Sequence, residues 1–141
     1  MTVTQWLLAP AFIHFALVMV QGLRMGRGRF VAFRDRTVRL GDGTGGKVRW
    51  PRPVALLSDN FSNQFEVPVL FYAILAFLLT TGLADEVQAI LAWAFVASRI
   101  VHAIIHTTTN VVPQRLAAYA AGICILVVMW IWFGLRLFVI G

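Results

Sequence analysis

The clearest pattern along the chain is a series of four long apolar stretches separated by short or polar segments. The first stretch covers residues 3–23, and the second covers 57–83, beginning with a more polar turn. The third covers 87–108 and is interrupted by Arg99, and the fourth covers 115–139. Because about 20 helical residues cross the hydrocarbon core of a bilayer, the pattern predicts an all-α integral membrane four-helix bundle.

Composition supports a membrane location for a single domain covering residues 1–141. The chain is 60% hydrophobic and 13% charged, whereas soluble domains carry about 25% charged residues. A soluble domain of this length could not bury so much apolar surface. A lipid-facing protein does not need to, because the bilayer itself is apolar.

The basic residues are unevenly distributed and indicate an orientation. The predicted first loop, 24–53, holds nine of the twelve Lys and Arg residues. Such a run could also be a solvated linker that touches nucleic acid, but its hydrophobic flanks favour a cytoplasmic membrane loop, and we expect no nucleic-acid partner. The third loop contributes Arg115, and the second has only Asp85 and Glu86. The positive-inside rule therefore predicts cytoplasmic first and third loops and external termini.

The connections and aromatic residues fit this arrangement. The second and third connections are short, so neighbouring helices should be antiparallel, and Pro113 is positioned to start the fourth helix. The glycine-rich centre of the first loop, Gly41–Gly46, should be flexible. Four tryptophans fall toward the external side, where interfacial tryptophan is common: Trp6, Trp93, Trp130 and Trp132.

Two sets of polar residues interrupt the apolar pattern at helical spacing. They are Asn60, Asn63 and Glu66 in the second helix, and Arg99, His102 and His106 in the third. Ionisable groups at membrane depth should face a bundle interior, a cavity or a partner. Counting from the second turn at about 1.5 Å per residue places Glu66 level with the two histidines and Asn63 near Thr107. We therefore predict a polar pocket on the cytoplasmic side, in which Glu66 meets a histidine or Arg99.

The basic end of the first helix, with Arg24 and Arg27, lies on the same side. A ligand with carboxylates and an amine would suit such a pocket, because arginine binds carboxylates and carboxylates bind ammonium groups. The alternative is that these groups pair with each other and hold helices together, which we favour for Arg99 because it lies deepest. His102 and His106 with Glu66 would give two histidines and a carboxylate, a ligand set found in some metal sites. This signal is weak, and we predict no metal.

These residues resemble the pattern of a known family. Asn63-Gln64-Phe65-Glu66-Val67-Pro68 resembles the Asn-x-x-Glu motif, followed by proline, of the MAPEG family of membrane-associated proteins in eicosanoid and glutathione metabolism. Arg99-Ile100-Val101-His102, followed by His106, is similar to the family's third-helix pattern. Residues 59–72 together with 97–110 look like the bacterial branch, which implies the bacterial inner membrane.

The resemblance implies a homotrimer with glutathione bound between neighbouring subunits near the cytoplasmic face. It implies these roles: Asn63 and Glu66 hold glutathione, Arg24 or Arg27 holds a glutathione carboxylate, His102 and His106 contact glutathione, and Arg115 stabilises the thiolate. The chain departs from active relatives where Ser58, Asp59 and Asn60 replace most of an Arg-Ala-x-x-Asn segment. It also lacks the third-helix tyrosines, and Pro113 stands where the thiolate-stabilising arginine would align.

Three functions follow as hypotheses. The first is a membrane-bound glutathione-dependent transferase or peroxidase acting on lipophilic electrophiles. The second is a non-catalytic protein of the same fold that binds another amphiphile or a lipid. The third, a small transporter, ranks last because the first helix offers only His14, whereas four-helix proton-coupled exporters place an essential carboxylate there.

Overall fold

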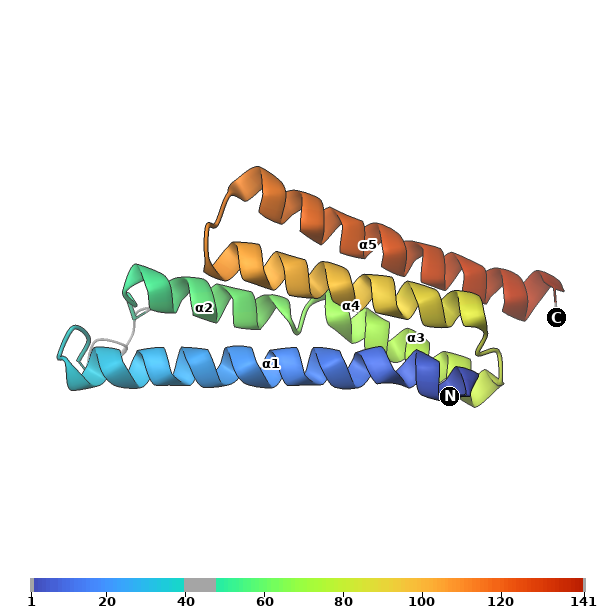
Figure 1. Ribbon diagram of the computed structural model, residues 1–141, viewed down its shortest axis with the longest axis horizontal. Helices are drawn as coiled ribbons and strands as arrows, with labels where there is room; N and C mark the ends of the chain where they lie inside the picture. Colours follow the sequence, from blue (N-terminus) through green and yellow to red (C-terminus); the bar gives the residue numbers. More distant parts are fainter. Residues whose placement is uncertain (1, 40–47, 141) are drawn as a thin grey trace.

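The computed structural model describes residues 2–39 and 48–140, and all the regular secondary structure in these residues is helical. The elements are α1 (Val3–Arg34), α2 (Arg52–Asn63), α3 (Val67–Thr81), α4 (Glu86–Thr107), α5 (Val112–Leu135) and a final π-helical turn (Arg136–Ile140). They form four spans long and apolar enough to cross a membrane, with α2 and α3 together making the second (Figure 1). The predicted all-α four-helix membrane bundle is confirmed, and Pro113 lies in the first turn of α5 as expected.

Helix α1 is longer than the apolar stretch that predicted it. It continues to Arg34, so the beginning of the predicted loop is helical. This extension packs against α2: a Cβ at Gly28 would lie 3.1 Å from the Val54 Cγ2 atom, so glycine permits the close approach. Ala32 is buried on the extension. The stretch Gly41–Gly46, predicted to be flexible, lies outside the described residues.

The predicted second helix, 57–83, consists of two helices separated by Gln64–Glu66. Pro68 lies in the first turn of α3. Proline has no N–H to bond the carbonyl of Gln64, four residues earlier, and its ring crowds that carbonyl. The helix is therefore interrupted there. Helix α3 ends at Gly82, whose φ of 70° is left-handed and suits glycine.

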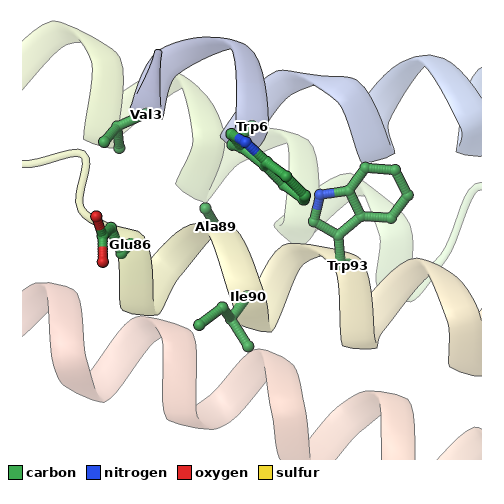
Figure 2. Close-up of a pocket in the computed structure, with 6 residues that line it drawn as sticks. All are labelled: Val3, Trp6, Glu86, Ala89, Ile90 and Trp93. Atoms are coloured by element: carbon green, nitrogen blue, oxygen red, sulfur yellow. The ribbon is translucent and has the colours of Figure 1, made fainter. Parts of the chain in front are cut away.

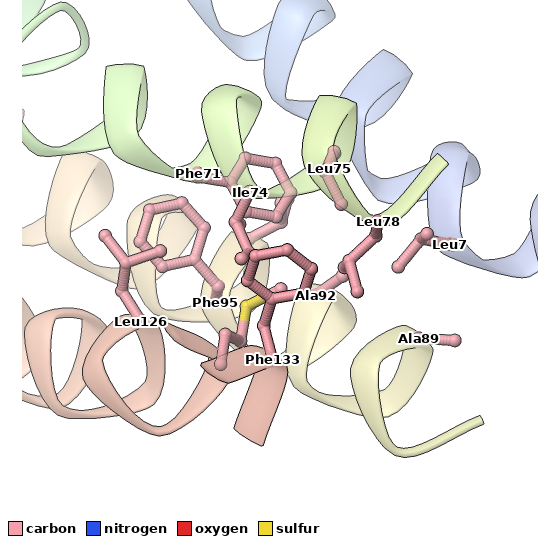
Figure 3. Close-up of a cluster of buried hydrophobic side chains, with 12 residues drawn as sticks. Leu7, Phe71, Ile74, Leu75, Leu78, Ala89, Ala92, Phe95, Leu126 and Phe133 are labelled. Atoms are coloured by element: carbon pink, nitrogen blue, oxygen red, sulfur yellow. The ribbon is translucent and has the colours of Figure 1, made fainter. Parts of the chain in front are cut away.

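A cluster of buried apolar side chains lies in the half of the bundle nearest the termini (Figure 3). Figure 3 shows it between α1, α3, α4 and α5, with Phe71 stacked on Phe95 at a centroid distance of 4.6 Å. The buried members are Leu7, Phe71, Ile74, Leu75, Leu78, Ala89, Ala92, Phe95, Val96, Leu126, Met129 and Phe133. The other half, beyond the helix break, contains most of the buried polar residues.

The two chain ends and the α3–α4 turn lie at the same end of the bundle (Figure 1). Asp85 fixes this end: it caps α4, and its Oδ2 accepts hydrogen bonds from Trp132 Nε1 at 2.8 Å and Arg136 NH1 at 2.7 Å. Trp6 of α1 packs edge-on against Trp93 of α4 at 5.8 Å. These tryptophans gather at the end where the sequence places an interfacial belt.

Candidate functional site

A polar cavity of about 370 Å³ opens between α2, α4 and the start of α5. Its lining residues are Asp59, Asn63, His102, His106, Val112, Arg115, Leu116 and Tyr119. The structure therefore brings together four residues that the sequence analysis selected: Asn63, both histidines and Arg115. Asp59, Tyr119 and the two apolar residues complete the lining.

The two histidines are held by different partners. His102 lies with its Nδ1 atom 3.1 Å from the Arg115 carbonyl oxygen, so Nδ1–H is the donor, and Nε2 of the neutral ring is an acceptor. That Nε2 atom is buried without a partner in the described part of the chain. Asn63 Nδ2 donates to His106 Nδ1 at 3.4 Å, close to the level that residue counting gave. Asn63 is thereby fixed beside a neutral imidazole whose Nε2–H remains as a donor.

Arg99 connects the broken second span to α4. It is fully buried, and its NH2 group donates to the Asn63 carbonyl oxygen at 3.1 Å. That carbonyl ends α2 at the interruption, so the bond replaces one that a continuous helix would supply. The guanidinium also lies over the Tyr119 ring at 5.4 Å. These contacts fit the structural role expected for Arg99.

Arg115 supplies the positive charge of the cavity. It is half-buried in the first turn of α5, and its NH1 group donates to Asn110 Oδ1 at 2.8 Å. Asn110 has a left-handed φ of 50°, a conformation that asparagine tolerates better than most residues. The α4–α5 connection therefore holds the Arg115 guanidinium at the cavity.

Glu66 does not join the predicted polar pocket. It is exposed, it does not line the cavity, and its carboxylate makes no hydrogen bond or ion pair within the described residues. Glu66 and Arg99 still interact electrostatically, although no hydrogen bond or ion pair joins them. The residue counting assumed a continuous helix, whereas the second span is interrupted at Gln64–Glu66, so helical spacing cannot be carried from Asn63 to Glu66.

The two basic residues of α1 also lie outside this cavity. Arg24 lines a second cavity of about 490 Å³ with residues of α2 and the α4–α5 connection. Arg27 is exposed and is not among the lining residues of either cavity. The cavities are neighbours, because Asn110 lines the second and binds Arg115, which lines the first.

The sequence analysis missed a buried polar network between α1, α2 and α3. His14 is fully buried, with Nδ1 2.9 Å from the Tyr72 hydroxyl and Nε2 3.2 Å from Gln64 Oε1. Gln64 Nε2 in turn donates to the Asn60 carbonyl at 3.3 Å. This orientation makes His14 Nε2–H the donor to Gln64, so Tyr72 donates to Nδ1. As the only ionisable residue of the first apolar stretch, His14 was the available signal.

A third cavity, of about 420 Å³, lies at the other end of the bundle between α1 and α4 (Figure 2). Figure 2 shows the Trp6 and Trp93 rings side by side there, with Glu86 as the charged lining residue. Its lining is otherwise apolar. The cavity with the histidines and Arg115 therefore remains the better candidate for polar chemistry.

The fold and the site define a polytopic membrane protein of four spans with a polar pocket at its basic end. The family model of the MAPEG family matches residues 7–135, which cover the greater part of each of the four spans. The chain belongs to the MAPEG family. No curated protein and no solved structure gave a significant match.

Proposed function

We propose that the protein is a membrane-bound glutathione-dependent transferase or peroxidase that acts on lipophilic electrophiles. The observation that carries the proposal is the mixed lining of the polar cavity. Arg115, Asn63 and the histidines offer donors and acceptors, while Val112 and Leu116 are 57% and 63% exposed on the same cavity. A polar co-substrate and a reactant arriving from the bilayer could therefore meet there.

The available groups match glutathione, which carries two carboxylates, an ammonium group and a thiol. Arg115 suits a carboxylate or the thiolate, and Asp59 suits the ammonium group. The free Nε2 of His102 provides a buried acceptor. Arg24, Arg27 and Glu66 do not line this cavity, so we propose that they take part from a neighbouring subunit, as the family resemblance implies.

The chemistry proposed for Arg115 is stabilisation of the thiolate. A free thiol has a pKa of about 8.5, and a nearby cation lowers it. The thiol proton passes to water at the cavity mouth, and the sulfur attacks the electrophilic carbon. A carbon–sulfur bond forms as the leaving group departs with its bonding electrons. In the peroxidase reaction, two glutathione molecules become the disulfide, and a hydroperoxide becomes an alcohol and water.

The test is glutathione binding and turnover by the purified protein in detergent. Calorimetry should detect binding, and conjugation of chlorodinitrobenzene or reduction of cumene hydroperoxide should report turnover. We expect Arg115→Gln to lower turnover about tenfold and to move its pH profile upward, because the thiol pKa would rise. Arg34→Gln removes a charge outside the cavity and should change neither turnover nor its pH profile. Absence of both binding and turnover would refute the proposal.

The second candidate is a non-catalytic protein that binds another amphiphile or lipid in the same cavity. The bond between Arg115 and Asn110 favours it, because a guanidinium already held by an amide is less available to a thiolate. Turnover distinguishes the two candidates. Binding of glutathione or an amphiphile that Asn63→Ala weakens, without any turnover, would support the second.

We further propose that the chain assembles as a homotrimer in a bacterial inner membrane. The proposal rests on family membership. Native mass spectrometry in mild detergent should show trimers. Monomers and dimers alone would contradict it.

A further inference from the structure

The second cavity at the basic end of the bundle has the chemistry of an anion site. It lies where α1, the start of α2 and the α4–α5 connection meet, and its volume is about 490 Å³. Its lining includes Arg24, Arg52, Leu56, Leu57, Thr109 and Asn110. Two arginines from different helices thus line one space.

These two charges have no competing acid. No carboxylate lines the cavity among the described residues. Arg24 and Arg52 are exposed, and neither makes a hydrogen bond or ion pair within the part of the chain that the structure describes. Their charges are therefore available to a ligand, and the site has a net positive charge.

Backbone and amide groups add further donors. Helix α2, which is 12 residues long, starts at Arg52 after Pro51, and no side chain caps its N-terminus. The positive end of its dipole and the free N–H of Arg52 therefore face the region of the cavity. Asn110 accepts a bond from Arg115 through Oδ1, which leaves its Nδ2 group as a donor.

The cavity continues into apolar surface. Leu56 and Leu57 belong to its lining. Leu23, next to Arg24 on α1, is 74% exposed, and Val20, one turn earlier, is 51% exposed. A small anion such as phosphate would leave this apolar surface uncovered, whereas an amphiphile with an acidic head would use both parts.

We propose that this cavity binds an anionic phospholipid, with its phosphate between Arg24 and Arg52 and an acyl chain along the outer face of α1. Anionic lipid is attracted to basic groups at the membrane surface by about 1 kcal/mol per Lys or Arg. Arg24 is also proposed to reach glutathione in a neighbouring subunit, so lipid binding is measured without glutathione and without reference to enzyme activity.

The test titrates delipidated protein in mild detergent with phosphatidylglycerol or phosphatidylcholine and counts bound lipid by native mass spectrometry. Phosphatidylglycerol should bind about tenfold more tightly. The double variant Arg24→Gln/Arg52→Gln should weaken its binding about tenfold, which corresponds to about 1.4 kcal/mol and removes the preference. Phosphatidylcholine binding should not change. Arg24→Lys/Arg52→Lys keeps both charges and should keep the preference.

The matched control is Arg27→Gln/Arg49→Gln, which removes the same charge from exposed residues that do not line the cavity. It should leave phosphatidylglycerol affinity within about threefold. An equal loss in the control would overturn the proposal, because the basic segment as a whole would then attract lipid. Displacement of the lipid by millimolar inorganic phosphate would also overturn it, because the phosphate alone would then be the ligand.

Discussion

Three buried polar side chains in this protein bind backbone carbonyls on another element. Arg99 donates to the Asn63 carbonyl, and His102 to that of Arg115. Gln88 Nε2 donates to the Met129 carbonyl at 2.9 Å. Because no water is available inside a bilayer, an unpaired polar group there costs several kcal/mol. These residues therefore connect helices as much as they form a site.

The cost of leaving a buried polar group unpaired can be tested at His14. His14→Leu should destabilise the protein by about 1–3 kcal/mol, because buried Gln64 Oε1 loses its donor. Unfolding in mixed micelles would measure the change. The double variant His14→Leu/Gln64→Leu should cost less than the sum of the single variants. Additive losses would show that the two side chains do not act together. Tyr72→Phe, at a more exposed position, should cost less.

Substitution of Glu66, unlike that of His14, should have little effect on stability. Glu66→Gln should change the free energy of unfolding by less than about 0.5 kcal/mol, as for most surface substitutions, because Glu66 is exposed and unpaired within the described residues. Breaking a buried ion pair would instead cost about 3–5 kcal/mol. Thermal unfolding of the detergent-solubilised protein separates these values, and a loss in the higher range would show that Glu66 has a buried partner.

Sequence spacing predicted part of the candidate site. His102 and His106 lie together because α4 is a continuous helix, in which residues four apart share a face. Glu66 was misplaced because Pro68 interrupts the second span, and periodicity cannot be continued across such a break. The network around His14 depends on contacts between helices distant in sequence, which no single-helix pattern contains.

At the scale of helices and turns, apolar runs predicted the spans but not all of their ends. Short, strongly signalled connections were located well: Gly82 ends α3, and Pro113 starts α5. The extension of α1 to Arg34 was not predicted, because its charged sequence resembles a loop. Its contacts with α2, such as Gly28 against Val54, are tertiary and appear only in the fold.

The α3–α4 turn should be a main support of the bundle end. Asp85→Ala removes the cap of α4, worth about 1 kcal/mol, and the bonds to Trp132 and Arg136. We expect a larger loss than from the cap alone. Asp85→Asn keeps a capping oxygen and should be milder. Glu86→Ala, at the exposed neighbouring residue, is the control. Equal effects of the Asp85→Ala and Glu86→Ala variants in thermal unfolding would show that neither the cap nor the bonds to Trp132 and Arg136 contribute.

At the scale of the whole molecule, two ends of contrasting chemistry face opposite sides of the apolar spans. One end carries the termini, the tryptophans and the Asp85 turn. The other carries the basic residues of α1 and α2, the polar cavity and the proposed lipid site. The positive-inside rule uses the unequal distribution of basic residues between the two ends to assign an orientation. It predicts that both cavities open toward the cytoplasm, where glutathione and anionic lipid headgroups would reach them.

Cysteine labelling tests this orientation directly. Cys124 is exposed, so a Cys124→Ala background removes it, and single cysteines replace Arg49 at the basic end and Glu86 at the other. In intact cells, a membrane-impermeant maleimide should label the Glu86→Cys variant only. After the membrane is opened, it should label both variants, because both positions are exposed. Labelling of Arg49→Cys in intact cells would reverse the orientation. The pocket would then face away from the cytoplasm, and the proposed glutathione chemistry would lose its supply of co-substrate.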